Sequence, residues 1–166
     1  MAITLQQATP GDILRIGALA ERIWREHYPP IIGEKQVDYM LDRFYKAEAL
    51  QQQIEDGQMF KLVMEGDEVL GFLSVSDRGE GRFFLHKFYL DNERRGRGLG
   101  KIVFELLLER FPGLRELRLT VNRENYKSIN FYFRIGFTIE QCVDIPIGEG
   151  FVMTDFQMLW RRHDLV

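Results

Sequence analysis

The chain has 166 residues, a usual length for one globular domain, so we expect a single domain over residues 1–166. Its net charge of -3, from 22 basic and 25 acidic residues, argues against a nucleic-acid binder, which needs a basic surface. No apolar stretch reaches the ~20 residues of a membrane-spanning helix, and one cysteine without a signal-peptide pattern favours a cytoplasmic protein without an internal disulfide.

The first third of the chain predicts a short strand followed by helices. The strand is expected at Ile3–Leu5, and Thr9-Pro10-Gly11-Asp12 is a helix-start signal. A helical run from Ile13 to Tyr28 is expected to end at Pro29-Pro30. Two further helices are expected at 37–45 and 47–54.

The rest of the chain alternates strands with helices. We expect strands at 59–64, 69–75, 82–90, 114–121, 137–145 and 151–160, and helices at 99–111 and 125–135. This order predicts an α/β (α+β) fold with a mixed, mostly antiparallel sheet and helices on both faces. The strand–helix–strand segment 82–121 should be a right-handed parallel crossover.

A basic, glycine-rich turn joins the strand ending at Leu90 to the helix starting near Leu99. Glycines let an anion approach the unpaired N–H groups of a helix N-terminus, so the turn predicts a phosphate or pyrophosphate site. P-loop and dinucleotide-binding glycine patterns do not fit, whereas Arg-x-x-Gly-x-Gly fits at Arg95, Gly98 and Gly100. A basic surface turn without a ligand is the alternative.

A second strand-to-helix junction follows at 121–125, where Asn125 is a natural N-cap. Ser128 and Tyr132 follow it at i+3 and i+7, on one helical face. An aromatic residue in such a stripe is usually a core residue, and that interpretation stays open for Tyr132.

Together, segments 95–100, 119–125 and 131–137 resemble the acyl-CoA-binding motifs of the GNAT family of N-acetyltransferases. The similarity runs from about Phe84 to Phe137, and more loosely includes 24–28 and 31–32, where many members cover the acceptor. Ser128 stands where the family often has Ala. The resemblance implies a GNAT-like fold, acetyl-CoA (coenzyme A) as the cosubstrate, and transfer of acetyl to an amine.

The resemblance also implies roles for individual residues. The pyrophosphate and the rest of the cofactor would be bound by Phe88, Tyr89, Leu90, Arg95, Gly96, Arg97, Gly98, Gly100, Lys101, Asn122, Asn125 and Ser128. Tyr132 would act as the general acid that protonates the leaving CoA thiolate. A phenol, with an ordinary pKa of ~10, is protonated at neutral pH yet can supply a proton as a thiolate forms.

Direct attack needs a neutral amine, so a group or a water chain must accept the proton of the ammonium. His86 is the first candidate, because an imidazole has an ordinary pKa of ~6.5 and family members often carry the base on this strand. A histidine that only satisfies a hydrogen bond is the alternative, and Glu26, Tyr28 and Asp155 are weaker candidates for the base.

The resemblance implies that Trp24 and Tyr28 bind the acceptor, and we expect Asp155 to attract its ammonium, with aromatic groups stacking on it. A solvated loop is the alternative for the acidic groups of the last strands. The sequence therefore predicts an acyl-CoA-dependent enzyme that acetylates a primary amine of a small molecule. The alternatives are acetylation of a protein N-terminus or lysine, and a non-catalytic acyl-CoA sensor. No metal site is expected, and the exposed edges of the last two strands could pair in a homodimer.

Overall fold

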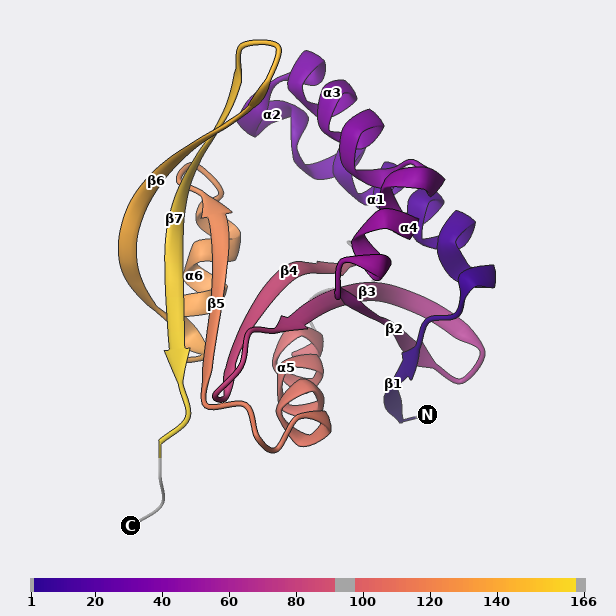
Figure 1. Ribbon diagram of the computed structural model, residues 1–166, viewed down its shortest axis with the longest axis vertical. Coiled ribbons are helices and arrows are strands. Elements are labelled where there is room, and N and C mark those ends of the chain that lie inside the picture. The colour runs from indigo at the N-terminus through magenta and orange to yellow at the C-terminus, as the bar shows by residue number, and fades with distance from the viewer. Residues whose placement is uncertain (1, 92–97, 164–166) are drawn as a thin grey trace. The chain divides into compact units, whose positions relative to one another are not determined.

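The structure is a computed structural model that describes residues 2–91 and 98–163 (Figure 1). Its elements in chain order are β1 (Ile3–Gln7), η1 (Pro10–Asp12), α1 (Ile13–His27), α2 (Pro29–Ile32), α3 (Glu34–Tyr45), α4 (Ala47–Glu55), β2 (Met59–Glu65), β3 (Glu68–Asp77), β4 (Arg82–Leu90), α5 (Leu99–Arg110), β5 (Glu116–Asn122), α6 (Tyr126–Arg134), β6 (Thr138–Gly148) and β7 (Phe151–Arg161).

The strands form one seven-stranded mixed sheet in the order β1-β2-β3-β4-β5-β7-β6. Antiparallel pairing joins β1 to β2, β2 to β3, β5 to β7 and β6 to β7. The pairing of β4 with β5 is parallel, with Arg82 opposite Glu116 and Phe84 opposite Arg118. The predicted mixed sheet with a parallel strand–helix–strand segment is therefore confirmed.

The chain divides into two compact units that share β4. Unit 1 consists of residues 1–76 and 86–112, and unit 2 of residues 77–85 and 113–166. The first part of β4 thus belongs to unit 2, and the part from His86 onwards belongs to unit 1. Each unit has its own buried apolar side chains.

Unit 1 covers its strands with helices on both faces, with α1 to α4 on one face and α5 on the other (Figure 1). Helix α1 buries Ile16, Ala20 and Ile23 at helical spacing, as an amphipathic helix does. Burial is continuous from Phe60 to Val63 in β2 and over most of β3. This pattern is typical of strands covered on both faces.

Gly71 lets β3 approach the end of β4 closely. A Cβ at this position would lie 2.2 Å from the Tyr89 carbonyl oxygen and 2.9 Å from the Leu90 Cα. The Asp91 N–H donates to the Leu70 carbonyl at 2.7 Å beside it. A side chain at Gly71 would force the two strands apart, so the glycine fixes the position of the β4 end.

Unit 2 shows the alternation predicted for β5, in which Leu117, Leu119 and Val121 are buried. Among the side chains between them, Arg118 donates to the two carboxylate oxygens of Glu140 at 2.9 and 3.1 Å. Gln157 donates to the same carboxylate at 2.6 Å. These residues come from β5, β6 and β7, so the network ties three neighbouring strands together.

Several local predictions are wrong. Pro29-Pro30 does not only end α1 but begins α2, because proline is tolerated in the first helical turn. Helix α3 begins at Glu34 rather than at 37, directly after Gly33 with φ +83°. Strand β5 begins at Glu116 rather than at 114. Cys142 lies on the edge strand β6 and is exposed, whereas a lone cysteine is usually a small core residue.

No helix within residues 2–91 and 98–163 is long and apolar enough to cross a bilayer. Over the same residues, no group of three or more His, Cys, Asp or Glu side chains is placed to hold a metal ion.

Candidate functional site

The N-cap residue of α5, Gly98, is exposed and has the left-handed φ of +68°. A Cβ at Gly98 would meet no atom of the described residues within 4 Å. No side chain of the described residues caps this helix, and its first turn carries no acidic residue. Because the first N–H groups of a helix lack intrahelical acceptors, the amides of Leu99, Gly100 and Lys101 fit an anion such as pyrophosphate.

The remaining residues predicted for this turn are Arg95, Gly96 and Arg97, which lie outside the described residues. The Lys101 side chain is exposed. Of the predicted anion site, the structure describes Gly98, Gly100 and Lys101.

The part of β4 in unit 1 carries the predicted base and the predicted pantetheine contacts. His86 is half-buried, and its Nε2 shares a hydrogen bond of 2.7 Å with the Ser76 hydroxyl, whose direction depends on the tautomer. Phe88 and Tyr89 are half-buried and Leu90 is buried. A hydrogen-bonded histidine is compatible with both interpretations of His86.

Two of the three predicted acceptor residues lie together in a group of aromatic side chains of unit 1. We call this group the aromatic cluster; its members are Trp24, Tyr28, Tyr45, Phe72 and Tyr89. Trp24 lies 4.3 Å from Tyr28, 5.5 Å from Tyr45 and 5.9 Å from Tyr89, between ring centroids. Phe72 lies 5.6 Å from Tyr89. Trp24 and Tyr45 are buried, and Tyr28 and Tyr89 are half-buried.

Tyr45 is the inner member of the aromatic cluster. Burial raises the pKa of its phenol, against the smaller lowering effect of its hydrogen bond with Tyr89. The phenol is therefore neutral at physiological pH. It acts as a packing and hydrogen-bonding group rather than as an acid.

Lys87 is a buried lysine that the sequence analysis did not single out. Its side chain is 7% exposed, and Nζ donates to Gln53 Oε1 at 2.7 Å and to Gln58 Oε1 at 3.1 Å. Burial lowers the pKa of Lys87 to about 7. The signal was available in β4, where Phe83, Leu85 and Lys87 alternate, so that a lysine occupies a core position.

In unit 2, residues at the junction between β5 and α6 form hydrogen bonds with one another. Asn122 Oδ1 accepts from the Glu124 N–H at 2.8 Å, and the Asn122 carbonyl accepts from the Asn125 N–H at 3.0 Å. Asn125 is 2% exposed, and its carbonyl accepts from the Ile129 N–H at 3.0 Å. The two predicted asparagines are thus brought together in one turn.

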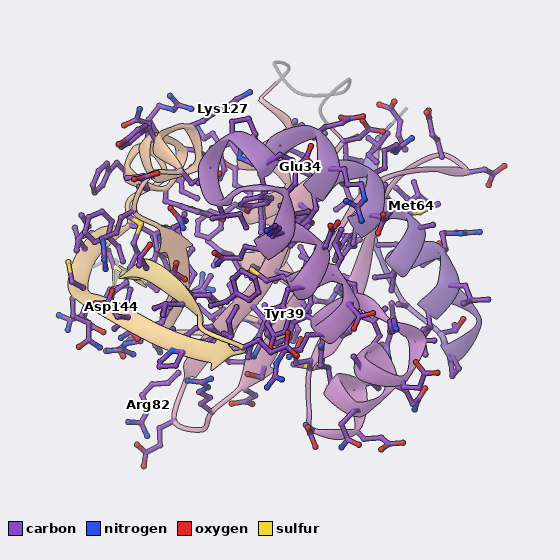
Figure 2. All side chains as sticks on the ribbon, turned by 90° about the horizontal axis from the view of Figure 1, so that it is seen from above. Glu34, Tyr39, Met64, Arg82, Lys127 and Asp144 are labelled. Carbon is purple, nitrogen blue, oxygen red and sulfur yellow. The ribbon has the colours of Figure 1, made fainter. Side chains whose placement is uncertain are left out.

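Tyr132 lies on the buried side of α6. Its exposed fraction is 9%, and its ring centroid lies 5.4 Å from that of Phe131 and 5.4 Å from that of Phe137. Ser128, one turn earlier, is half-buried, whereas Lys127 projects outward from the helix (Figure 2). This buried position is compatible with both interpretations of Tyr132, a general acid and a core aromatic residue.

Asp155, the third predicted acceptor residue, is a buried carboxyl in unit 2. It lies opposite Asn122 in the β5–β7 register and is 4% exposed. Burial raises the pKa of Asp155 to about 6, although a hydrogen bond with Thr120 and the charge of Arg123 act in the opposite direction. The carboxyl is therefore mostly ionised at pH 7 and can attract an ammonium.

Comparison with known proteins identifies relatives along most of the chain. Residues 18–137 match the Acetyltransferase (GNAT) family. The spermidine N(1)-acetyltransferase of Thermoplasma acidophilum is 26% identical over 166 aligned residues, which cover 92% of this chain and 96% of that protein. The peptidyl-lysine N-acetyltransferase YjaB of Salmonella typhimurium is 30% identical, over 60% of this chain and 65% of that protein.

A solved structure shares the fold. The crystal structure of the PaiA N-acetyltransferase from Thermoplasma acidophilum, in complex with coenzyme A, superposes with a TM-score of 0.79. The sequence identity is 22%, and the match covers 98% of this chain and 100% of that one.

Proposed function

Because this chain belongs to the GNAT acetyltransferase family and is an acyl-CoA-dependent N-acetyltransferase that uses acetyl-CoA, we propose that it acetylates a small polyamine such as spermidine. The observation that carries the proposal is the similarity to a spermidine N(1)-acetyltransferase over 92% of this chain. A small multivalent cation is also the acceptor for which the predicted acceptor residues are chemically suited.

The acceptor would be recognised by aromatic faces and one carboxylate. Trp24 and Tyr28 stack at 4.3 Å in unit 1, and such rings attract a cation. Asp155 in unit 2 supplies a negative charge at pH 7. A polyamine carries several ammonium groups separated by apolar methylene segments, and aromatic faces and a carboxylate each attract an ammonium.

For the donor, the N–H groups at the start of α5 would hold the pyrophosphate, with Gly98 leaving room for the oxygens. Arg95, Gly96 and Arg97 would extend this contact, while Phe88 to Leu90, Asn122, Asn125 and Ser128 would bind the rest of the molecule. When bound, acetyl-CoA supplies an acetyl group activated as a thioester.

Two residues of this chain would move the protons. The His86 imidazole would accept the proton of the acceptor ammonium, directly or through water, so that a neutral amine is available. The Tyr132 phenol would donate its proton to the CoA sulfur as the thiolate leaves.

A second candidate acceptor is a protein lysine, favoured by the similarity to the peptidyl-lysine acetyltransferase YjaB. The two candidates are separated by measuring CoA release with spermidine and with a lysine-containing peptide. We expect kcat/KM to be at least ~10-fold higher for spermidine, since one methylene-sized mismatch already costs ~10-fold or more in an enclosed site. A preference for the peptide would replace the polyamine by a protein acceptor.

Tyr132→Phe tests the mechanism. Loss of a general acid should lower kcat for spermidine by ~10²-fold or more, while the coenzyme A Kd stays within about twofold. CoA thiol release gives kcat and calorimetry gives Kd. Tyr126→Phe is the matched control, because Tyr126 lies on the same helix but is 67% exposed. An unchanged kcat in Tyr132→Phe would remove Tyr132 from the mechanism.

A further inference from the structure

We propose that Lys87 is a positioning residue for acceptor binding: its ammonium holds Tyr45 in place, and Tyr45 in turn holds the aromatic cluster. This inference rests on the proposed function, because it takes Trp24 and Tyr28 as acceptor-binding residues. It assigns a role to a buried charge that neither proton transfer uses.

The ammonium of Lys87 is enclosed by neutral groups from four parts of unit 1. Besides Gln53 of α4 and Gln58 before β2, it lies 5.5 Å from the Tyr45 ring centroid of α3 and 5.3 Å from the Phe60 ring centroid of β2. Ser74 of β3 completes the surroundings by donating to the same Gln58 oxygen at 2.9 Å. Tyr45 is thus the one titratable side chain among these groups.

A short path leads from Lys87 to the acceptor-binding residues. Gln53 accepts from Lys87 through Oε1 and donates through Nε2 to the Phe44 carbonyl at 2.9 Å. The network therefore fixes both the ring of Tyr45 and the backbone directly before it. Tyr45 then contacts Trp24, its hydroxyl is hydrogen-bonded with Tyr89, and Trp24 contacts Tyr28.

The energetics of Lys87 argue for a role beyond packing. A buried cation without a carboxylate costs stability, and an apolar side chain of similar length often stabilises such a position. Neighbouring β2 contains Lys61, which is also buried at 5% exposure, with its ammonium 5.9 Å from the Phe111 ring centroid. Within the part of the chain that the structure describes, Lys61 has no hydrogen bond or ring contact with the aromatic cluster, so it separates a general cost of burial from a specific role.

The test compares Lys87→Met with Lys61→Met at pH 6.5, using spermidine and acetyl-CoA. We expect Lys87→Met to raise the spermidine KM by ~10-fold, because Tyr45 and Trp24 lose their fixed positions, with kcat and the coenzyme A Kd within about threefold. Its Tm should be equal to or above that of the wild type. Lys61→Met should leave the spermidine KM within about twofold.

Three results would overturn the inference. They are an unchanged spermidine KM in Lys87→Met, an equal rise of KM in Lys61→Met, and a rise of KM explained by a lower Tm with a parallel loss of coenzyme A binding. A wild-type protein that turns over no amine would instead contradict the proposed function, and the inference would fall with it. The Tm and coenzyme A measurements keep these cases apart.

A second variant tests the charge without removing the lysine. Burial lowers the pKa of Lys87 to about 7, so the wild-type spermidine KM should approach that of Lys87→Met above pH 8. Gln58→Glu places a carboxylate beside Nζ, keeps an oxygen to accept from Lys87 and Ser74, and raises the pKa of Lys87. The low KM should then persist to higher pH, and an unshifted pH dependence would contradict the role of the ammonium.

Discussion

Units 1 and 2 each contain a helix that directly follows a loop after a strand, but the two helix N-termini differ in what they leave available. At α5 the N-cap is Gly98, which is exposed and has free space around its Cα. At α6 the N-cap is Asn125, which is 2% exposed and bonded within its own turn. An N-terminus attracts an anion only where the anion can reach its N–H groups, so we propose α5 rather than α6 as the pyrophosphate site.

The units also differ in how they bury an ionisable side chain. Lys87 in unit 1 is surrounded by amides and aromatic rings, and burial alone lowers its pKa. Asp155 in unit 2 is assisted by Thr120 and Arg123, which oppose the effect of burial. The pKa of Lys87 is lowered and that of Asp155 is raised, so each charged form costs folding stability near pH 7. A buried charge with such a cost suggests a functional reason for keeping it.

Gly98→Ala tests the difference between the N-termini of α5 and α6, and we expect it to have the largest effect. Alanine at a left-handed position costs on the order of 1–2 kcal/mol, and its methyl group would occupy the space that we propose for the pyrophosphate. We expect the coenzyme A Kd to rise by at least ~10-fold, measured by calorimetry.

Gly113→Ala is the control for this glycine. A Cβ at Gly113 also meets no atom within 4 Å, but the residue is not in the left-handed region. The variant should bind coenzyme A as the wild type does. An unchanged Kd in Gly98→Ala would mean that the first turn of α5 does not hold the pyrophosphate.

Much of the fold followed from the sequence because local patterns decide it. The alternation of Leu117, Leu119 and Val121 predicts β5, and the order of elements predicts the parallel pair of β4 and β5. Boundaries were less accurate where proline acted as a helix start at Pro29 rather than as a stop. Whether a proline starts or ends a helix depends on the residues that pack around the turn.

The candidate site was predictable only in part. Its glycines and asparagines carry a local signal, since they permit turns and backbone contacts. The sequence signal for Lys87 was weaker, because its proposed role depends on Gln53 and Gln58, which are 34 and 29 residues away. The aromatic cluster likewise joins α1, α3, β3 and β4, and the sequence spacing of its residues does not predict these ring contacts.

Asp155→Asn tests the comparison between the buried charges of Lys87 and Asp155. We expect it to have the smallest effect, on the pH dependence of stability. The pKa of Asp155 is raised from its ordinary 3.8 to about 6, so the folded state binds more protons than the unfolded state between these values. The free energy of unfolding of the wild type should therefore fall as pH rises from 4 to 6, by about 1–3 kcal/mol. Urea titrations at several pH values measure this slope, which Asp155→Asn should remove.

Asp144→Asn is the matched control, because Asp144 has an exposed side chain and loses only its surface ion pair with Arg123. Its slope between pH 4 and 6 should equal that of the wild type. Lys87 should act in the opposite pH range, since a lowered pKa means that stability rises between about 7 and 10.5. Parallel curves for Asp155→Asn and the wild type would show that unit 2, unlike unit 1, compensates its buried charge fully.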